Sequence, residues 1–199
     1  MFEHYFIDKE HKKEDYFNFK YVFNNKTYNF TSVDNVFSKN TVDYGSLVLI
    51  NSVIKNYDLN NKKCLDLGSG VGVIGIFLKD YFKNADFTLS DITKSASKLS
   101  ERNAKQNNIE VKVVNSNLFE NLNENFDFII TNPPIKSGKK LLFSLVEESF
   151  KHLNTDGRLV LVIRKNHGEE SLKKHIESIF ENCEILKRDS GYYILSAIK

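Results

Sequence analysis

The chain has 199 residues, 41% of them hydrophobic, which suits one compact domain with a core of ordinary size. A formal net charge of +2 and a pI of about 8.3 make it mildly basic, below the pI of about 9 that marks an obvious nucleic-acid-binding domain. No run reaches the roughly 18 apolar residues of a membrane span, and the charged segment 1–17 lacks the apolar stretch of a secretory signal. We therefore expect a cytoplasmic protein that does not bind membranes.

Residues 1–40 are expected to form an N-terminal extension that packs on a catalytic domain of residues 41–199. Alternating apolar and polar residues on both sides of Asn24 and Asn25 predict a β-hairpin in this extension. The segment 41–57 has the pattern of a helix that leads into the first strand of the domain.

From Cys64 onward, runs rich in Val, Ile, Leu and Phe alternate with amphipathic segments of helical length. This alternation predicts a doubly wound, Rossmann-like α/β fold with a seven-stranded, mostly parallel sheet and helices on both faces. The last two strands are separated only by a polar turn around Asp189, Ser190 and Gly191, so one strand must run antiparallel. The expected strands are 63–67, 86–91, 111–116, 126–132, 158–165 and two within 183–199, and the expected helices are 70–83, 93–108, 140–153 and 169–180.

The two cysteines, Cys64 and Cys183, lie far apart in apolar, strand-like runs, which favours buried free thiols over a disulfide. Neither they nor the five histidines have the spacing of metal ligands. We therefore predict no metal site.

The segment DLGSGVGVIG, after the first predicted parallel strand, carries two overlapping glycine motifs. Gly68, Gly70 and Gly72 fit GxGxG, whereas Gly70, Gly72 and Gly75 fit GxGxxG. Both motifs predict a tight turn from strand to helix where missing Cβ atoms let a ligand approach the backbone. Glycines that only shape the turn are the plain alternative.

Two carboxylates accompany this turn. Asp91 ends the second strand, where a carboxylate can accept the ribose hydroxyls of NAD or of S-adenosylmethionine alike. Asp66 lies inside an apolar strand and costs several kcal/mol if it is unpaired. The amino group of S-adenosylmethionine would offset that cost, and NAD has no such cation. Asp66 therefore favours S-adenosylmethionine, unless it only caps backbone N–H groups.

Pro133 and Pro134 are the only prolines in the chain, and they follow Asn132 at the end of the fourth strand. Their adjacency indicates a rigid functional loop rather than a simple strand terminator. Such a loop suits methylation of a planar amino group, because the Asn132 side-chain oxygen and the Pro133 carbonyl could hold its two hydrogens and direct its lone pair. Positioning of this kind supplies roughly 7–11 kcal/mol, and no strong general base is needed.

With these segments the chain resembles the class I S-adenosylmethionine-dependent methyltransferases, and within them the RsmC-like family of small-subunit ribosomal RNA guanine-N2 methyltransferases. The resemblance covers nearly all of the chain from about Val36, through VFSKNTVDYGSLVLI, LDLGSGVGVIGI, NSNLFENL and TNPPIKSGK. It implies S-adenosylmethionine as cofactor, an exocyclic amine of ribosomal RNA, foremost guanine N2, as acceptor, and a monomer acting on ribosomal RNA or the small ribosomal subunit. The implied catalytic residues are Asn132, Pro133, Pro134 and Ile135, and the implied cofactor contacts are Asp66, Gly68, Ser69, Gly70, Gly72, Asp91, Ile92, Asn117, Leu118 and Asn132.

Two departures from the resembled pattern bear on the ligands. Asn117 stands where many relatives carry Asp opposite the adenine, and it keeps an acceptor for the adenine amino group. Ile135 replaces the aromatic residue of adenine-N6 and glutamine-N5 enzymes, which stacks on the target for roughly 1–3 kcal/mol per base. This replacement favours guanine N2 over those two acceptors without eliminating either.

Basic residues follow the fourth and fifth strands, where doubly wound sheets gather their ligand crevices. If these residues line the entrance of one crevice, they would contact RNA phosphates. They would then determine the affinity for RNA rather than the sequence that is bound. Ordinary solvated side chains are the alternative. The residues concerned are Lys136, Lys139, Lys140, Arg164 and Lys165.

Two readings outside the methyltransferases also remain open. One is an NAD-dependent oxidoreductase that uses the GxGxxG motif, against which Asp66 and the Asn-Pro-Pro loop argue. The other is a non-catalytic RNA-binding module, which the intact loop and proline pair disfavour.

Overall fold

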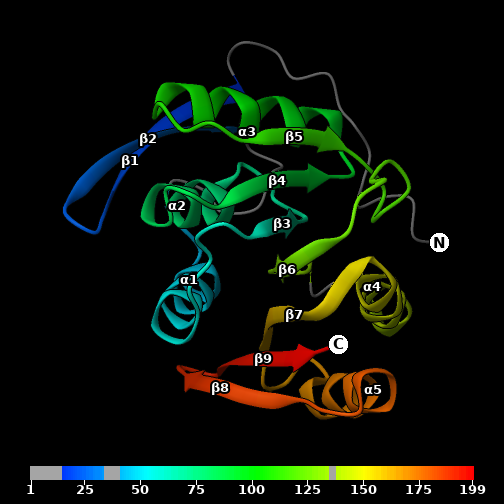
Figure 1. Ribbon diagram of the computed structural model, residues 1–199. Coiled ribbons are helices and arrows are strands. Elements are labelled where there is room, and N and C mark those ends of the chain that lie inside the picture. The colour runs from blue at the N-terminus through cyan, green and yellow to red at the C-terminus, as the bar shows by residue number, and fades with distance from the viewer. Residues whose placement is uncertain (1–14, 34–40, 135–137) are drawn as a thin grey trace.

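The computed structural model describes residues 15–33, 41–134 and 138–199. Its main sheet has the order β5-β4-β3-β6-β7-β9-β8 and is parallel except for β9, which runs antiparallel to both neighbours (Figure 1). The predicted doubly wound fold with one reversed strand is therefore confirmed. The sheet strands are β3 (Lys63–Leu67), β4 (Asp86–Asp91), β5 (Lys112–Asn115), β6 (Phe126–Thr131), β7 (Leu153–Arg164), β8 (Glu184–Asp189) and β9 (Tyr192–Ile198).

Helices cover both faces of this sheet, and each face has its own apolar core. Leu49, Ile76 and Phe77 belong to the core beneath the first three helices, whereas Val146 and Ile176 belong to the core beneath the last two. No helix of the described segments is long and apolar enough to cross a membrane. The helices are α1 (Tyr44–Asn56), α2 (Val73–Tyr81) and α3 (Lys94–Gln106) on one face, and α4 (Gly138–His152) and α5 (Glu169–Phe180) on the other (Figure 1).

The predicted hairpin is present as β1 (Tyr16–Phe23) and β2 (Lys26–Val33), and it turns at Asn24 and Asn25 as expected. Both turn residues have positive φ values, 47° and 61°, which a tight two-residue turn requires and Asn tolerates. The hairpin packs on the face that α2 and α3 cover, with the ring of Phe23 stacked on Phe77 at 4.6 Å.

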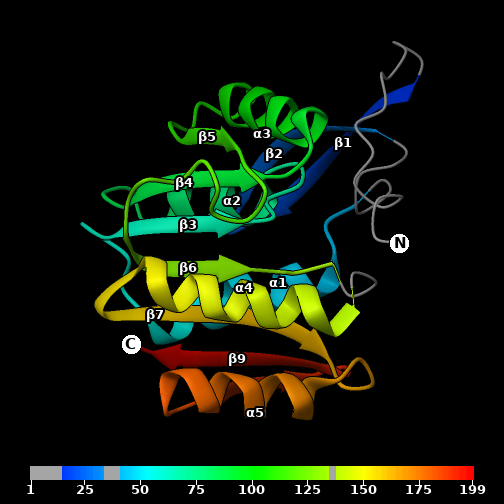
Figure 2. The same ribbon diagram turned by 90° about the vertical axis from the view of Figure 1, so that its right-hand side faces the viewer.

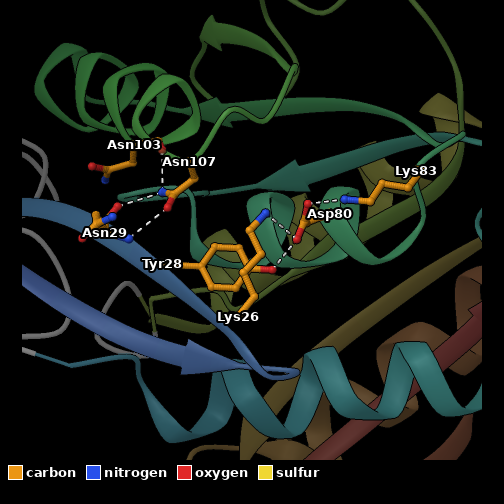
Figure 3. Close-up of polar contacts among 7 residues, drawn as sticks. All are labelled: Lys26, Tyr28, Asn29, Asp80, Lys83, Asn103 and Asn107. Carbon is orange, nitrogen blue, oxygen red and sulfur yellow. Dashed lines mark hydrogen bonds and ion pairs between the residues drawn. The ribbon is translucent and has the colours of Figure 1, made fainter.

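A polar network also fixes the hairpin to α2 (Figure 3). The Tyr28 hydroxyl donates to Asp80 Oδ2 at 2.6 Å, and Lys26 donates to the same oxygen at 2.9 Å, while Lys83 pairs with Asp80 Oδ1. Partial burial alone would raise the pKa of Asp80, but the hydrogen bonds from Lys83, Tyr28 and Lys26 lower it to about 2. The carboxylate therefore stays ionised across the neutral range.

Asn103 in α3 and Asn107, which caps the carboxyl end of α3, cover the outer edge of β2 in place of another strand. Asn107 accepts from the Asn29 N–H at 2.9 Å and donates to the Asn29 carbonyl at 2.8 Å (Figure 3). Asn103 does the same for Thr31, at 2.8 and 3.0 Å, and also donates to the Val71 carbonyl at 2.9 Å. Asn103 thus links the hairpin directly to the glycine-rich loop.

Two local features differ from the expectations. Strand β7 begins at Leu153, directly after α4, rather than near residue 158. Leu153 pairs with Phe126, and after a register shift the regular pairing of β6 with β7 resumes at Phe128 and Arg158. Cys64 is a buried free thiol as expected, but Cys183 is only half-buried. Burial raises the pKa of both thiols, to about 11 for Cys183.

Candidate active site at the carboxyl edge of the sheet

The carboxyl ends of β3, β4 and β6 meet at one edge of the sheet (Figure 2). From β3 the next strands are added on one side as far as β5, and the chain then crosses back to add β6 on the other side of β3. Open α/β sheets bind ligands at such a switch point in the strand order. Thr131 at the end of β6 donates its hydroxyl to the Leu67 carbonyl at 2.7 Å. The segments after these strands, which carry the expected ligand-binding residues, are therefore held side by side.

The glycine-rich loop after β3 folds against β4. The N–H groups of Gly68 and Ser69 both donate to the Ser90 carbonyl, at 2.8 and 2.9 Å. Gly68 and Gly70 have φ values of 73° and 55°, which glycine adopts without a steric penalty. A Cβ atom on Gly68 would meet nothing within 4 Å, so this side of the loop is open.

Two other glycines of the motif serve packing. Gly72, which precedes α2, has a φ of 87°, and a Cβ there would lie 2.9 Å from Cβ of Ser100 in α3. A Cβ on Gly75 would lie 2.6 Å from Cδ1 of Leu89. The close approach of helices and sheet requires both glycines, and the cofactor contact that the resemblance implies for Gly72 stays a prediction.

Asp66 is fully buried in β3. Its Oδ2 accepts the Gly75 N–H at 2.8 Å, so the capping role considered for it applies to that oxygen. Its Oδ1 has no hydrogen-bond partner within the described part of the chain. Burial raises the pKa of Asp66 to about 7; the Gly75 hydrogen bond opposes this shift, and the charge of Asp91 adds to it.

Two hydroxyls of nearby residues also lack a hydrogen-bond partner in the described segments. Ser69 Oγ and Ser90 Oγ are buried and, like Asp66 Oδ1, have no partner among the residues described. A buried polar group without a partner costs roughly 1–3 kcal/mol. Asp66 directly precedes the glycine-rich loop and Ser69 lies in it, so a polar ligand bound at this loop could supply their missing hydrogen bonds. The Ser90 side chain lies on the opposite face of the sheet from Asp66, because Asp66 pairs with Leu89.

Asp91 lies at the end of β4 and faces the glycine-rich loop. Its Oδ2 accepts the Gly70 N–H at 2.9 Å, and its Oδ1 accepts the N–H and the hydroxyl of Thr93 at 3.0 and 3.1 Å. Because a carboxylate has about four acceptor positions, Asp91 keeps one free for a ribose hydroxyl. A second hydroxyl would have to displace the Thr93 side chain.

The segment after β5 borders the same edge. Asn115, which sequence reasoning missed, donates to the carbonyls of Asp91 and Ile92, both at 2.9 Å, and so fixes the turn after β4. Asn117 is exposed and donates its amide N–H to Glu120 at 2.8 Å, which leaves its amide oxygen as an acceptor. Leu118 has a φ of 48° and packs against the core of the α4 and α5 face.

Asn132 follows β6 and is held by α1. Its amide nitrogen donates to Asp43 Oδ2 and to Ser46 Oγ, both at 2.9 Å. Asp43 caps the N-terminus of α1 by accepting the Ser46 N–H at 2.9 Å. The Asp43 carboxylate can only accept hydrogen bonds, so the amide of Asn132 cannot rotate to exchange its nitrogen and oxygen. The Asn132 amide oxygen is therefore the acceptor on the side away from Asp43. Sequence reasoning missed both partners, although an Asp before a helical pattern is a recognisable cap.

Pro133 is buried and Pro134 half-buried, directly after Asn132. Ile135 and Lys136, assigned to the catalytic loop and to RNA binding respectively, lie outside the described residues. Lys139 and Lys140 are exposed in the first turn of α4.

The segments that carry the two basic groups lie close together at this edge. Arg164 and Lys165 are exposed at the end of β7. A Cβ on Gly168, in the loop after β7, would lie 3.9 Å from Cε of Lys139. The start of α4 and the loop after β7 are therefore neighbours, as the RNA-binding hypothesis requires.

A family model described as the methyltransferase small domain matches residues 27–196 of this chain. The protein belongs to the methyltransferase small domain family. The expectation of a methyltransferase drawn from the sequence is thereby confirmed. The matched range starts within β2, and the division of the chain at residue 40 stays a prediction.

Relatives of this methyltransferase fall into two length classes. YbxB of Bacillus subtilis strain 168, described as uncharacterized, is 38% identical over 202 residues, 100% of both chains. The ribosomal RNA small subunit methyltransferase C of Buchnera aphidicola is 33% identical over 171 residues, 83% of this chain and 51% of that protein. The chain thus spans about half the length of the relatives with that name.

A solved structure supports the fold of this methyltransferase. The 16S rRNA N2 methyltransferase RsmC of T. thermophilus, in complex with AdoMet and guanosine, superposes with a TM-score of 0.84 at 24% identity. The match covers 92% of this chain and 50% of the other.

Proposed function

We propose that the protein transfers a methyl group from S-adenosylmethionine to the exocyclic N2 of guanine in small-subunit ribosomal RNA, in the cytoplasm. The observation that carries this proposal is the fixed amide of Asn132. Asp43 and Ser46 occupy its nitrogen, so its oxygen is left as an acceptor. Asn132 follows Thr131, which pairs with Leu67 directly before the glycine-rich loop.

The residues around the loop fit this methyl donor. The open space above Gly68 and the unpartnered atoms of Asp66 and Ser69 are the features expected of a binding site for a polar, flexible ligand. Asp66 would pair with the ammonium of the methionyl group, and Asp91 would accept a ribose hydroxyl. Asn117 and Leu118 would border the adenine.

The chain's own residues would act mainly by positioning. The guanine amino group is flat because its lone pair is delocalised, so it is a weak nucleophile. S-adenosylmethionine, when bound, supplies a methyl group on a positively charged sulfur. Asn132 Oδ1 and the Pro133 carbonyl would accept the two amine hydrogens and hold the nitrogen lone pair toward that methyl group. On accepting the methyl group, the guanine nitrogen would lose one proton to water, so no strong general base would be required.

Guanine N2 is favoured over other amino groups by the relatives. Those of about twice the length are named ribosomal RNA small subunit methyltransferases, and RsmC of T. thermophilus was solved with guanosine. The sequence itself carries Ile135 where a stacking aromatic would favour adenine N6 or glutamine N5. Methylation of a protein glutamine is the second candidate, because its amide is equally flat.

Radiolabelled S-adenosylmethionine incubated with under-modified small ribosomal subunits tests this proposal. Digestion of the RNA should yield label in N2-methylguanosine, and Asn132→Ala should remove it. Label in N6-methyladenosine, or in protein, would contradict the proposed acceptor. A thermal shift with S-adenosylhomocysteine but not with NAD would separately support the proposed cofactor.

A further inference from the structure

Two aromatic rings and a guanidinium lie together next to the residues that hold Asn132. Tyr44, the first residue of α1, follows Asp43 in the chain and is 47% exposed. Its ring centroid lies 5.9 Å from that of Tyr192, at an interplanar angle of 55°. The Arg164 guanidinium lies over the Tyr192 ring, 5.1 Å from the centroid. Tyr44, Tyr192 and Arg164 are called the aromatic cluster below.

The aromatic cluster is held rigidly by its surroundings. The Tyr44 hydroxyl donates to Asp189 Oδ1 at 3.0 Å. Gly45 lets Tyr192 pack against the start of α1, since a Cβ there would lie 2.7 Å from Cε1 of the Tyr192 ring. Arg164 and Tyr192 are direct partners across the antiparallel pair of β7 and β9. Little side-chain freedom remains to be lost when a ligand packs on these rings.

The charges near the aromatic cluster suit a nucleic acid. Arg164 and Lys165 are exposed at the end of β7, and the Lys165 N–H donates to the Gly191 carbonyl at 2.8 Å, which keeps them beside the turn before β9. Asp189, the carboxylate that accepts the Tyr44 hydroxyl, also has Lys187 at 3.8 Å. Cationic side chains around an exposed aromatic ring are the usual surface for single-stranded RNA.

We propose that the aromatic cluster binds a nucleotide that flanks the methylated guanine in a single-stranded segment of RNA. The base of that nucleotide would stack on the exposed ring of Tyr44, and its phosphate would contact Arg164 or Lys165. This inference rests on the proposed function and adds a second subsite to it. The catalytic loop offers Ile135 rather than an aromatic, so the stacking surface near the acceptor comes from α1 and β9.

Three variants test the subsite. Tyr44→Ala removes the ring, and Tyr44→Phe keeps the ring but removes the hydroxyl. Tyr81→Ala is the matched control, because Tyr81 is 45% exposed but ends α2, a helix that starts at the carboxyl edge and runs away from it. For Tyr44→Ala we expect KM for RNA to rise about tenfold with kcat within about twofold of wild type. Tyr44→Phe and Tyr81→Ala should keep the wild-type KM.

A binding assay separates this inference from the proposed function. Fluorescence anisotropy with a short guanine-containing single-stranded RNA requires no methyl transfer. Tyr44→Ala should weaken this binding about tenfold, with unchanged affinity for S-adenosylhomocysteine as the control for folding. If wild type binds the RNA but methylates only protein, the proposed function fails and the subsite survives.

The RNA itself can be varied if Tyr44→Ala does not fold. Abasic nucleotides placed on each side of the guanine in turn should weaken wild-type binding about tenfold on one side. Equal affinity of wild type for all these RNAs would overturn the inference. So would a folded Tyr44→Ala protein whose KM and RNA affinity match those of Tyr81→Ala.

Discussion

Asp43 holds the side-chain amide of Asn132 at 2.9 Å, although the two residues are separated by 89 positions in the chain. One belongs to the cap of α1 and the other to the tip of β6. The same carboxylate oxygen accepts the Ser46 N–H at 2.9 Å, so the helix cap and the amide share a single anchor. The orientation of the proposed catalytic amide therefore depends on how α1 begins.

Asp43→Ala should lower kcat about 10- to 100-fold, because the Asn132 amide loses its main orienting partner. It should also cost about 1 kcal/mol of stability, since α1 loses its cap. Asp43→Asn is the matched variant, because Asn still caps a helix and still offers an oxygen to Asn132. Steady-state kinetics and urea unfolding check both. Equal kcat values for Asp43→Ala and wild type would refute the orienting role.

Asp91→Ala should weaken S-adenosylhomocysteine binding about 10- to 100-fold. The substitution removes a charged acceptor for a ribose hydroxyl, worth roughly 1.5–3 kcal/mol, and releases the Gly70 N–H. Calorimetry measures the change, with Tyr81→Ala as a surface control. Undiminished affinity would count against the ribose assignment.

The affinity for S-adenosylhomocysteine should depend on pH through Asp66. Burial raises the pKa of this carboxyl to about 7, so below that pH the free protein holds Asp66 protonated. A bound ammonium selects the ionised form, and binding must then release a proton. Affinity should fall roughly tenfold per pH unit from about pH 7 toward pH 5 and level off above pH 7.

Asp66→Asn provides the control, since it cannot ionise and should flatten this profile. The raised pKa of Asp66 predicts the opposite pH trend for the stability of the ligand-free protein. Asp66 holds its proton more tightly in the folded state than in the unfolded state. The contribution of Asp66 to the free energy of unfolding is therefore present at low pH and is lost as pH rises from about 4 to about 7. A flat affinity profile for wild type would exclude contact between Asp66 and the ammonium.

Asn103→Ala should destabilise the protein by about 2–4 kcal/mol. Asn103 is fully buried, and its loss leaves the N–H and carbonyl of Thr31 and the carbonyl of Val71 without partners. Gln106→Ala, one turn along the same helix, removes only an exposed side chain with a single bond to Thr31 and should cost under about 0.5 kcal/mol. Urea unfolding compares the two, and equal losses would contradict the role given to Asn103.

The fold could be predicted because alternating apolar runs and amphipathic segments specify a doubly wound sheet by themselves. The turn at Asn24 and Asn25 and the reversed β9 likewise follow from local signals. Asn103 and Asn107 could not be recognised, because a polar α3 looks solvated until β2 is seen to pack on it.

The candidate site shows the same limit. The glycines, Asp91 and Asn132 could be recognised, because each lies at or directly after the end of a strand that the sequence pattern predicts. The partners that orient them, Asp43 and Asn115, come from distant elements that only the folded sheet brings near. Tyr44 and Tyr192 of the aromatic cluster could not be paired from the sequence either, because only the fold brings α1 and β9 together.

Two measurements on Asn132→Ala test whether this side chain positions the amine: methyl transfer to under-modified small ribosomal subunits in a single turnover, and the dissociation constant of S-adenosylhomocysteine. We expect transfer to fall by a factor of about 100 or more, because the flat amine loses the acceptor that positions it, while the dissociation constant changes only a few fold. Transfer at the wild-type rate would contradict this positioning role.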